Sequence, residues 1–189
     1  MKYFFLRTIL NLLKAGIYVT SLSVRIMSSI KIISGDLGGR NIKTKRNRNL
    51  KPTPSRVREQ IFSWLRPLKE DLICLDLFAG SGSLGIEAFS NGAKEVVFVE
   101  QNQELYNTLY KNCDNLSILD KVKLHKQSAE NYLRRTKETV FDLIFLDPPY
   151  NKNYTNLLLP KIISDFSKAG TLIYICLLYT SDAADEPMR

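Results

Sequence analysis

Cysteine and histidine are scarce in this sequence. Its cysteines, Cys74, Cys113 and Cys176, stand far apart without a Cys-x-x-Cys spacing, and His125 is the single histidine. A disulfide framework or a structural metal site needs more of these residues at closer spacing. The sequence therefore predicts neither disulfides nor a metal, and it is typical of a protein of the reducing cytoplasm.

Long uninterrupted apolar runs are also missing. Residues 1–26 are apolar and basic, but Lys14 interrupts them below the length of a membrane span, and no small-residue cleavage site follows. A regular strand pattern begins only after Met27. We interpret residues 1–26 as an extension from an upstream start codon, rather than a targeting peptide, and we expect no membrane partner.

The other end of the chain does not follow the pattern of the rest. Cys176 to Glu186 reads as the translation of a transposase adapter that is used in preparing sequencing libraries. We therefore interpret residues 176–189 as an artefact that replaces the native C-terminus.

Acidic residues are rare in the front part of the sequence. The formal net charge is +8, and residues 27–60 contribute +7, from nine basic and two acidic residues. Residues 61–189 carry a small net negative charge. This asymmetry predicts that the front end binds a polyanion.

The front end also has its own structural pattern. Residues 30–34 and 40–44 flank a glycine-rich turn and predict a β-hairpin, which a basic segment, 45–51, follows. Thr53 is a candidate N-cap, with Pro54 at the first position of a helix. The helical spacing places Val57, Ile61, Trp64, Leu65 and Leu68 on the core face and leaves Arg56 and Arg58 exposed to solvent.

From residue 72 onward, apolar strands alternate with helices. Strands are predicted at 72–77, 95–100, 121–126, 141–147 and 170–175, and helices at 82–91, 102–114, 128–136 and 154–168, where Pro160 suggests a kink or a later start. This alternation indicates a doubly wound, Rossmann-like parallel sheet.

A glycine loop follows the first of these strands. Gly80, Gly82 and Gly85 fit the dinucleotide fingerprint, and Glu100 falls where a ribose-binding acid is expected. The loop alone is compatible with NAD or with S-adenosylmethionine. Asp76 at the end of the strand disfavours a pyrophosphate and suits a cationic amino-acid group, so S-adenosylmethionine is favoured.

The sequence Asp147-Pro148-Pro149-Tyr150 ends another apolar strand. The carboxyl edge of a parallel sheet is where α/β folds place their active sites. The prolines remove two N–H donors and leave carbonyl acceptors, Asp147 adds a carboxylate, and Tyr150 adds an aromatic face. This set suits the exocyclic amine of a nucleobase, although a simple turn at a strand end has the same letters.

Together these motifs resemble a known family. Leu75 to Gly82, Glu100 and Asp147 to Tyr150 are similar to class I S-adenosylmethionine-dependent N-methyltransferases. Ile32-Ile33-Ser34-Gly35, Gly39-Arg40 and Pro52 to Glu59 narrow the resemblance to the RsmD family, bacterial enzymes that methylate the exocyclic N2 of one guanine in 16S rRNA. The similarity covers about residues 30–175.

The resemblance implies a separate role for each part of the chain. Residues 27–53 would form the hairpin and the RNA-binding segment, and residues 54–175 a methyltransferase domain whose last strands are missing. Catalysis would rest on Asp147, Pro148, Pro149 and Tyr150. The cofactor would be held by Asp76, Phe78, Ala79, Gly80, Ser81, Gly82, Glu100, Ser128 and Ala129, and the RNA by Arg40, Lys45, Arg46, Arg48, Lys51, Thr53, Arg56 and Arg58.

The expected protein is a cytoplasmic monomer that acts on 16S rRNA in a partly assembled small ribosomal subunit. Two alternatives remain open from the residues. A DNA adenine or cytosine N-methyltransferase would use the same four residues, but it needs a separate target-recognition domain. A non-catalytic RNA-binding assembly factor would not need the intact glycine loop, Glu100 and Asp147.

Overall fold

The computed structural model describes residues 27–45, 53–65, 67–68, 71–136, 139–149 and 154–176. The expectations for residues 1–26 and 177–189, and for Arg46, Arg48, Lys51, Tyr150 and the side chain of Lys45, lie outside this part. Within these ranges, no helix is long and apolar enough to cross a bilayer.

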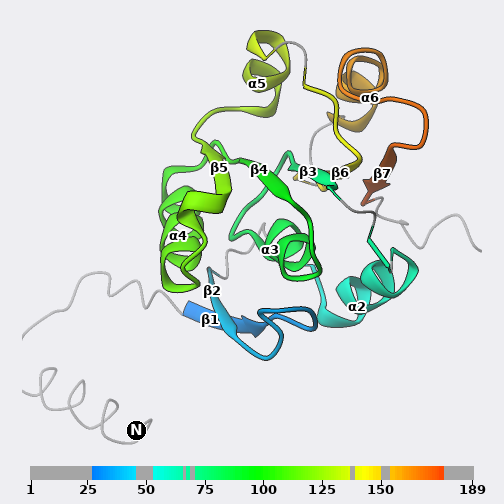
Figure 1. Ribbon diagram of the computed structural model, residues 1–189. Helices are drawn as coiled ribbons and strands as arrows, with labels where there is room; N and C mark the ends of the chain where they lie inside the picture. The colour runs from blue at the N-terminus through cyan, green and yellow to red at the C-terminus, as the bar shows by residue number, and fades with distance from the viewer. Residues whose placement is uncertain are drawn as a thin grey trace, which may run out of the picture.

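A five-stranded sheet forms the centre of the molecule (Figure 1). Its strands run in the order β5-β4-β3-β6-β7, and every neighbouring pair is parallel. The predicted parallel α/β sheet is therefore confirmed. The strands are β3 (Ile73–Asp76), β4 (Glu95–Val99), β5 (Val122–His125), β6 (Leu143–Leu146) and β7 (Leu172–Ile175).

Helices cover both faces of the sheet. The helices α5 (Ala129–Arg135) and α6 (Tyr154–Asp165) lie on one face, and α2 (Ser55–Trp64), α3 (Ser83–Ser90) and α4 (Gln103–Asn115) lie on the other (Figure 1). A short 3-10 helix, Leu119–Lys121, precedes β5. Pro160 lies inside α6, which begins at Tyr154, so the predicted later start is wrong.

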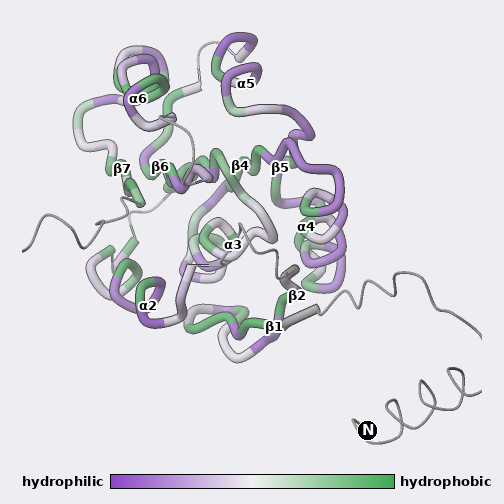
Figure 2. The backbone as a smooth tube through the Cα atoms, turned by 180° about the vertical axis from the view of Figure 1, so that it is seen from behind, coloured by the Kyte–Doolittle hydropathy of each residue, from purple (hydrophilic) through white to green (hydrophobic). Residues whose placement is uncertain are grey.

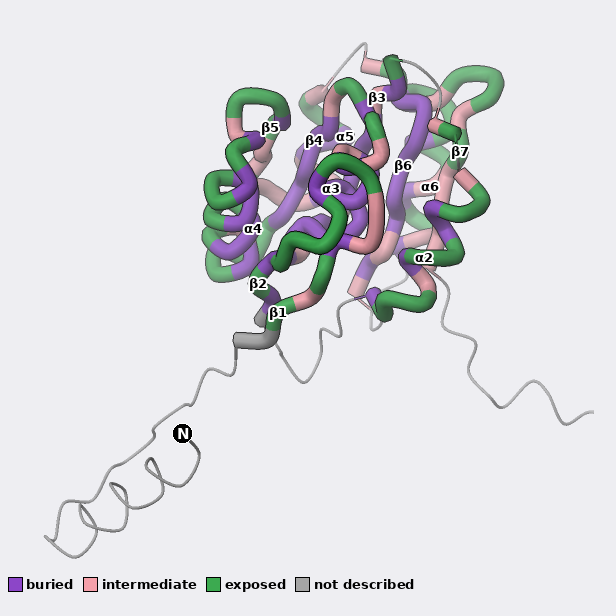
Figure 3. The backbone as a smooth tube through the Cα atoms, turned by 60° about the horizontal axis from the view of Figure 1, so that its bottom comes forward, coloured by how far each residue is buried: buried purple, intermediate pink, exposed green. Residues whose placement is uncertain are grey.

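Alternate residues of the strands feed two separate cores. In β3 and β4, Cys74, Val96 and Phe98 pack on the α3 side, while Leu75 and Val97 pack on the α5 side. This alternation follows from the two-residue period of a strand. The apolar strands stand out in Figure 2, and Figure 3 shows that α3 is buried with them beneath the hairpin.

The front end of the chain forms the predicted hairpin in a shifted position. The strand β1 (Met27–Lys31) pairs antiparallel with β2 (Asn41–Lys45), with Ile30 opposite Ile42. The first strand thus ends before Ile32, because the turn bends to pack on the end of α3. A Cβ atom on Gly35 would lie 1.7 Å from the Ser90 carbonyl oxygen, so only glycine allows this approach.

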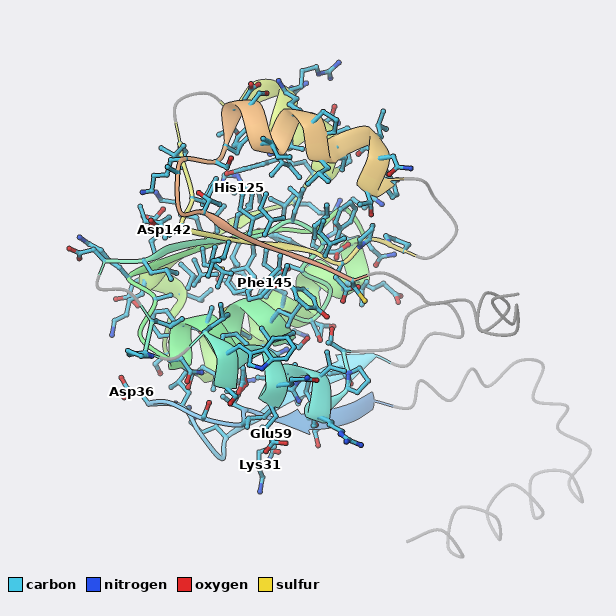
Figure 4. All side chains as sticks on the ribbon, turned by 90° about the vertical axis from the view of Figure 1, so that its right-hand side faces the viewer. Lys31, Asp36, Glu59, His125, Asp142 and Phe145 are labelled. Atoms are coloured by element: carbon cyan, nitrogen blue, oxygen red, sulfur yellow. The ribbon has the colours of Figure 1, made fainter. Side chains whose placement is uncertain are left out.

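The helix α2 faces the core with most of the predicted residues, because Ile61 is buried and Val57, Leu65 and Leu68 pack against the core. Its buried side chains are Arg58, Ile61 and Phe62, whereas Trp64 is 74% exposed. The Phe62 ring lies 6.1 Å from the ring of Phe145 of β6, which Figure 4 shows pointing to this side of the sheet. The predicted core position of Trp64 and the predicted exposure of Arg58 are therefore wrong.

Candidate active site

The glycine loop joins β3 to α3, as predicted. Gly80 and Gly82 both have positive φ, +57° and +89°, which allows the chain to turn directly from strand into helix. Gly85 serves a different purpose, because a Cβ atom there would lie 2.2 Å from the Phe98 ring of β4. The first two glycines thus shape the loop, and the third brings α3 close to the sheet.

Glu100 follows β4 and reaches across to this loop. One carboxylate oxygen accepts the Gly80 N–H at 2.8 Å, and the other accepts the Asn102 N–H at 2.6 Å. Burial raises the pKa of Glu100, while the N–H groups of Asn102 and Gly80 act in the opposite direction. Glu100 therefore orders the loop itself, and its oxygens still have lone pairs for a ligand hydroxyl.

Asp76 ends β3 behind the loop, and it is only 2% exposed. Its carboxylate accepts the Gly85 N–H at 3.0 Å, at the start of α3. Burial raises the pKa of Asp76 to about 7, the Gly85 hydrogen bond opposes this, and the charges of Asp147 and Glu100 raise it further. Three carboxylates thus gather at one edge of the sheet, where a cation would be favoured.

Asp147 follows β6, the neighbour of β3 on its other side. It is partly exposed, and its Oδ2 accepts a hydrogen bond from the Thr53 hydroxyl at 3.0 Å. The thiol of Cys176, at the end of β7, is also hydrogen-bonded to Asp147. Pro148 is buried and Pro149 is partly exposed, so this turn is held by packing as well as by the proline rings.

A pocket of about 160 Å³ opens between these groups. Pockets that enclose most of a drug-sized ligand have volumes of about 300 Å³ or more, so the described residues would enclose such a ligand only in part. The walls come from the carboxyl ends of β3, β4, β5 and β6 and from the start of α4. They comprise Leu77, Phe78, Gly80, Val99, Glu100, Gln101, Asn102, Leu105, Gln127, Ala129, Asp147 and Pro149.

The predicted cofactor residues divide into two groups. Phe78, Gly80, Glu100 and Ala129 line this pocket, together with Asp147 and Pro149. The others support it from behind: Asp76, Ala79, Ser81 and Gly82 are buried in or beside the loop, and the Ser128 hydroxyl caps α5 by accepting the Asn131 N–H.

Several pocket residues were not predicted from the sequence. Gln101 and Asn102 directly follow Glu100, and Gln127 comes two residues after β5. Their positions directly after predicted strands could have identified them, because the carboxyl ends of parallel strands meet at one edge of the sheet. Asn102 has a second task, since its side chain caps α4 by accepting the N–H groups of Glu104 and Leu105.

The predicted RNA-binding residues that the structure describes differ in their exposure to solvent and in their contacts. Arg56 is exposed on α2 and can reach a ligand. Arg40 is exposed, but its guanidinium donates to the carbonyls of Asn115 and Leu116 at the end of α4, at 2.8 and 3.4 Å. A cation is favoured at the carboxyl end of a helix, so Arg40 stabilises the end of α4.

Arg58 and Thr53 correct the predicted set. Arg58 has no exposed surface, and its Nη1 lies 3.4 Å from Oε2 of the buried Glu87, so it cannot contact RNA. Thr53 is 8% exposed and does not cap α2. Pro54 is the N-cap residue instead, and the Thr53 hydroxyl bonds to Asp147.

The site contains what a cationic nucleoside cofactor requires. Apart from the chain neighbours of Gly80, no atom of the described residues lies within 4 Å of the position of a Cβ there, so a ligand can approach the backbone. Glu100 supplies oxygen acceptors, and Phe78, Val99 and Leu105 supply apolar walls. The residues present therefore fit a ligand such as S-adenosylmethionine.

Comparison with known proteins supports this interpretation of the site. The family model described as Conserved hypothetical protein 95 matches residues 30–188. Ribosomal RNA small subunit methyltransferase D from Buchnera aphidicola subsp. Acyrthosiphon pisum is 40% identical over 152 residues, which span 78% of each chain.

Solved structures share the fold. The Escherichia coli protein yhhF has a TM-score of 0.67 and 31% identity, over 78% of this chain and 80% of its own. TYW2 of P. horikoshii, solved in complex with MeSAdo, has a TM-score of 0.58 over 84% of this chain and 53% of its own. Its identity is 19%, so that likeness concerns the fold alone.

Proposed function

We propose that this chain, which belongs to the RsmD family and is an rRNA methyltransferase, methylates the exocyclic N2 amine of one guanine in 16S rRNA. The model of this family is described as Conserved hypothetical protein 95. The observation that carries this proposal is the meeting of three strand ends at one pocket. The glycine loop of β3, Glu100 after β4 and Asp147 after β6 all contribute to its walls.

S-adenosylmethionine is the proposed methyl donor. Phe78, Gly80, Glu100 and Ala129 would hold it, with Glu100 on the ribose and Ala129 beside the adenine. The gathered carboxylates suit its positive charge. When it is bound, this cofactor supplies a methyl group on a sulfonium sulfur, which makes that methyl electrophilic.

Asp147 and the Pro148 carbonyl would receive the guanine amine. The nitrogen lone pair of that amine is delocalised into the ring, which makes it a poor nucleophile. Hydrogen bonds from its two N–H groups to these acceptors favour a more pyramidal nitrogen and stabilise the positive charge that develops on it. The proton that the amine releases would pass to Asp147 or to water.

Tyr150 completes the proposed acceptor site. Its ring would stack on the guanine once the base leaves its helix, and this would hold the amine near the attack distance. The basic segment 45–51 and the exposed Arg56 would bind the RNA phosphates around the target guanine. We expect the enzyme to act on a partly assembled small subunit, as a cytoplasmic monomer.

A methyl-mapping experiment tests the proposed function. Small subunits that lack the modification are incubated with the protein and methyl-labelled S-adenosylmethionine, and the label is located in the RNA. We expect one labelled guanine N2 in 16S rRNA. Label on an adenine or cytosine of the RNA, or methyl transfer to DNA in a parallel incubation, would contradict the proposed substrate.

The same experiment with Asp147→Ala tests the acceptor site. This variant should bind S-adenosylmethionine within a few-fold of the parent and transfer almost no methyl, because Asp147 faces the acceptor amine. Near-normal turnover would show that the proposed role of Asp147 is wrong.

A further inference from the structure

One hydrogen bond connects the segment before α2 to the candidate catalytic acid. Thr53 and Asp147 are 94 positions apart in the sequence, and the Thr53 hydroxyl donates to Asp147 Oδ2 at 3.0 Å. Thr53 is 8% exposed, so little water competes for its hydroxyl. A contact between residues so distant in the sequence has no part in forming a local turn or helix.

This hydroxyl is not required for the start of α2. The N–H groups of Val57 and Arg58 donate to the Pro54 carbonyl at 3.0 and 3.1 Å, and Pro54 is the N-cap residue. The Ser55 hydroxyl accepts from Arg58 Nη2 at 3.1 Å. Thr53 therefore directs its hydroxyl away from the helix and into the active site.

Asp147 needs such a contact if its carboxylate is to keep one orientation. The two prolines that follow it stiffen the backbone, but they leave the side-chain torsions of Asp147 unrestricted. A hydrogen bond to Oδ2 fixes the rotation of the carboxylate and thereby the direction of both oxygens. Within the part of the chain that the structure describes, the Cys176 thiol also bonds to Asp147, but a thiol is a weak donor.

The position of Thr53 is itself held in place. Phe62 of α2, the helix that begins two residues after Thr53, packs on Phe145 of β6 with 6.1 Å between the ring centres. Asp147 comes two residues after Phe145. The helix and the strand are thus joined both at the core and at the active site.

We propose that Thr53 is a positioning residue for methyl transfer, whose hydroxyl holds the Asp147 carboxylate in the orientation that receives the acceptor amine. This inference rests on the proposed function. It replaces the direct contact with RNA that the sequence suggested for Thr53. A positioning residue acts on the turnover of bound substrate, whereas a phosphate contact acts on the affinity for RNA.

The test compares variants of Thr53 in the methyl-transfer assay. Thr53→Val keeps the shape and removes the hydroxyl, and we expect kcat to fall about tenfold, the effect of one lost hydrogen bond of about 1.4 kcal/mol. The KM for small subunits and the Kd for S-adenosylmethionine should stay within about twofold of the parent values. Thr53→Ser, which retains the hydroxyl, should restore most of the lost turnover.

Thr108→Val is the matched control. Thr108 is also buried, and its hydroxyl donates to the Glu104 carbonyl within α4. This variant should keep the parental kcat, so a general effect of removing a buried hydroxyl is distinguished from the specific effect at Asp147. If Thr53→Val does not fold, as judged by binding of S-adenosylmethionine, Thr53→Ala takes its place.

Three results would overturn the inference. These are a kcat of Thr53→Val within twofold of the parent, a Thr53→Ser variant as slow as Thr53→Val, and a defect confined to the KM for RNA. An inactive parent protein is a different result, because it would remove the proposed function and this inference with it.

Discussion

At the scale of single residues, Glu100 has two partners, through which we expect it to act on cofactor binding. Its carboxylate accepts the N–H groups of Gly80 and Asn102, so Glu100→Gln would place an amide donor against a backbone donor. We expect this variant to weaken S-adenosylmethionine binding by roughly 1–3 kcal/mol, because a buried donor loses its acceptor and the loop loses its shape. Calorimetric titration measures the change.

Glu95→Gln is the control for this measurement. Glu95 lies at the opposite end of the same strand, where it pairs with Lys123 at 2.8 Å near the surface. Its replacement should leave cofactor binding unchanged. Equal affinities of Glu100→Gln and the parent would remove Glu100 from the cofactor site.

Asp76 makes the stability of the protein depend on pH. Its pKa is about 7 in the folded state and 3.8 in an ordinary environment, mainly because it is buried. Between these values the folded protein holds a proton that the unfolded chain has released. Stability therefore falls as the pH rises from about 4 to about 7, by at most about 1.4 kcal/mol per pH unit.

Urea unfolding between pH 5 and pH 7 checks this dependence. The side chain of Asp76→Asn cannot ionise. The free energy of unfolding of this variant should therefore decrease less than that of the parent as the pH rises over this range. Parallel curves for the two proteins would show that Asp76 is ionised throughout.

The sequence predicted the site residues that follow strands, but not those that depend on distant partners. Glu100 and Asp147 could be found because each directly follows an apolar run, and such ends meet at one edge of a parallel sheet. Arg58 and Thr53 could not be placed. Their partners, Glu87 and Asp147, lie 29 and 94 positions away, and no local periodicity reports such pairings.

At the scale of elements, Glu87 of α3 binds both the hairpin and α2. Its carboxylate accepts the N–H groups of Ile33 and Ser34, and it faces the guanidinium of Arg58. Burial lowers the pKa of Arg58, and the charge of Glu87 opposes this effect. The ion pair thus joins the front end of the chain to the methyltransferase sheet.

Removal of one partner should be costly. We expect Arg58→Met to lower the free energy of unfolding by about 3–5 kcal/mol, because it leaves a buried carboxylate without its cation. Urea unfolding measures the loss. This would be a large part of the stability of an ordinary domain, about 5–15 kcal/mol.

Arg56→Met is the natural comparison, two positions away on the same helix. Arg56 is exposed, so its replacement should change stability by no more than about 0.5 kcal/mol. If both variants lost the same stability, the buried pair would not be what anchors α2.

The elements themselves were predictable to within a few residues, and their faces less so. The helix and strand periods placed the segments of the central sheet and the helices between them. The apolar spacing in α2 favoured a face with Trp64, but the helix is rotated so that Arg58 turns inward. The gain from pairing Arg58 with Glu87 depends on α3, which local spacing in α2 does not include.

At the scale of the whole molecule, we expect the positive charge of the front end to determine the affinity for RNA. Four basic residues of this segment should contact phosphates, and their replacement by glutamine should reduce the slope of log K against log salt by up to about 3. Methylation of the correct guanine should persist at low salt. The residues are Lys45, Arg46, Arg48 and Lys51.

A charge-matched control is available at the edge of the sheet opposite the candidate active site. Four lysines there lie near the amino ends of the strands, on the side where Asp142 stands in Figure 4. Their replacement by glutamine removes the same charge and should leave the salt slope unchanged. An equal change in both variants would show that total charge, and not the front segment, determines RNA affinity. These residues are Lys94, Lys121, Lys123 and Lys168.

The order of the strands determines when the active site can exist during synthesis of the chain. β3 and β4 belong to one continuous unit, Ile73 to Val99, while β6, on the other side of β3, begins only at Leu143. The ribosome therefore releases the residues of the cofactor side well before Asp147. Until then one edge of β3 has no partner, so the nascent chain exposes an apolar strand edge that is prone to aggregation. Arrival of β6 covers this edge and adds Asp147 in the same step, so we expect the proposed acceptor site to form only after β6 has paired with β3.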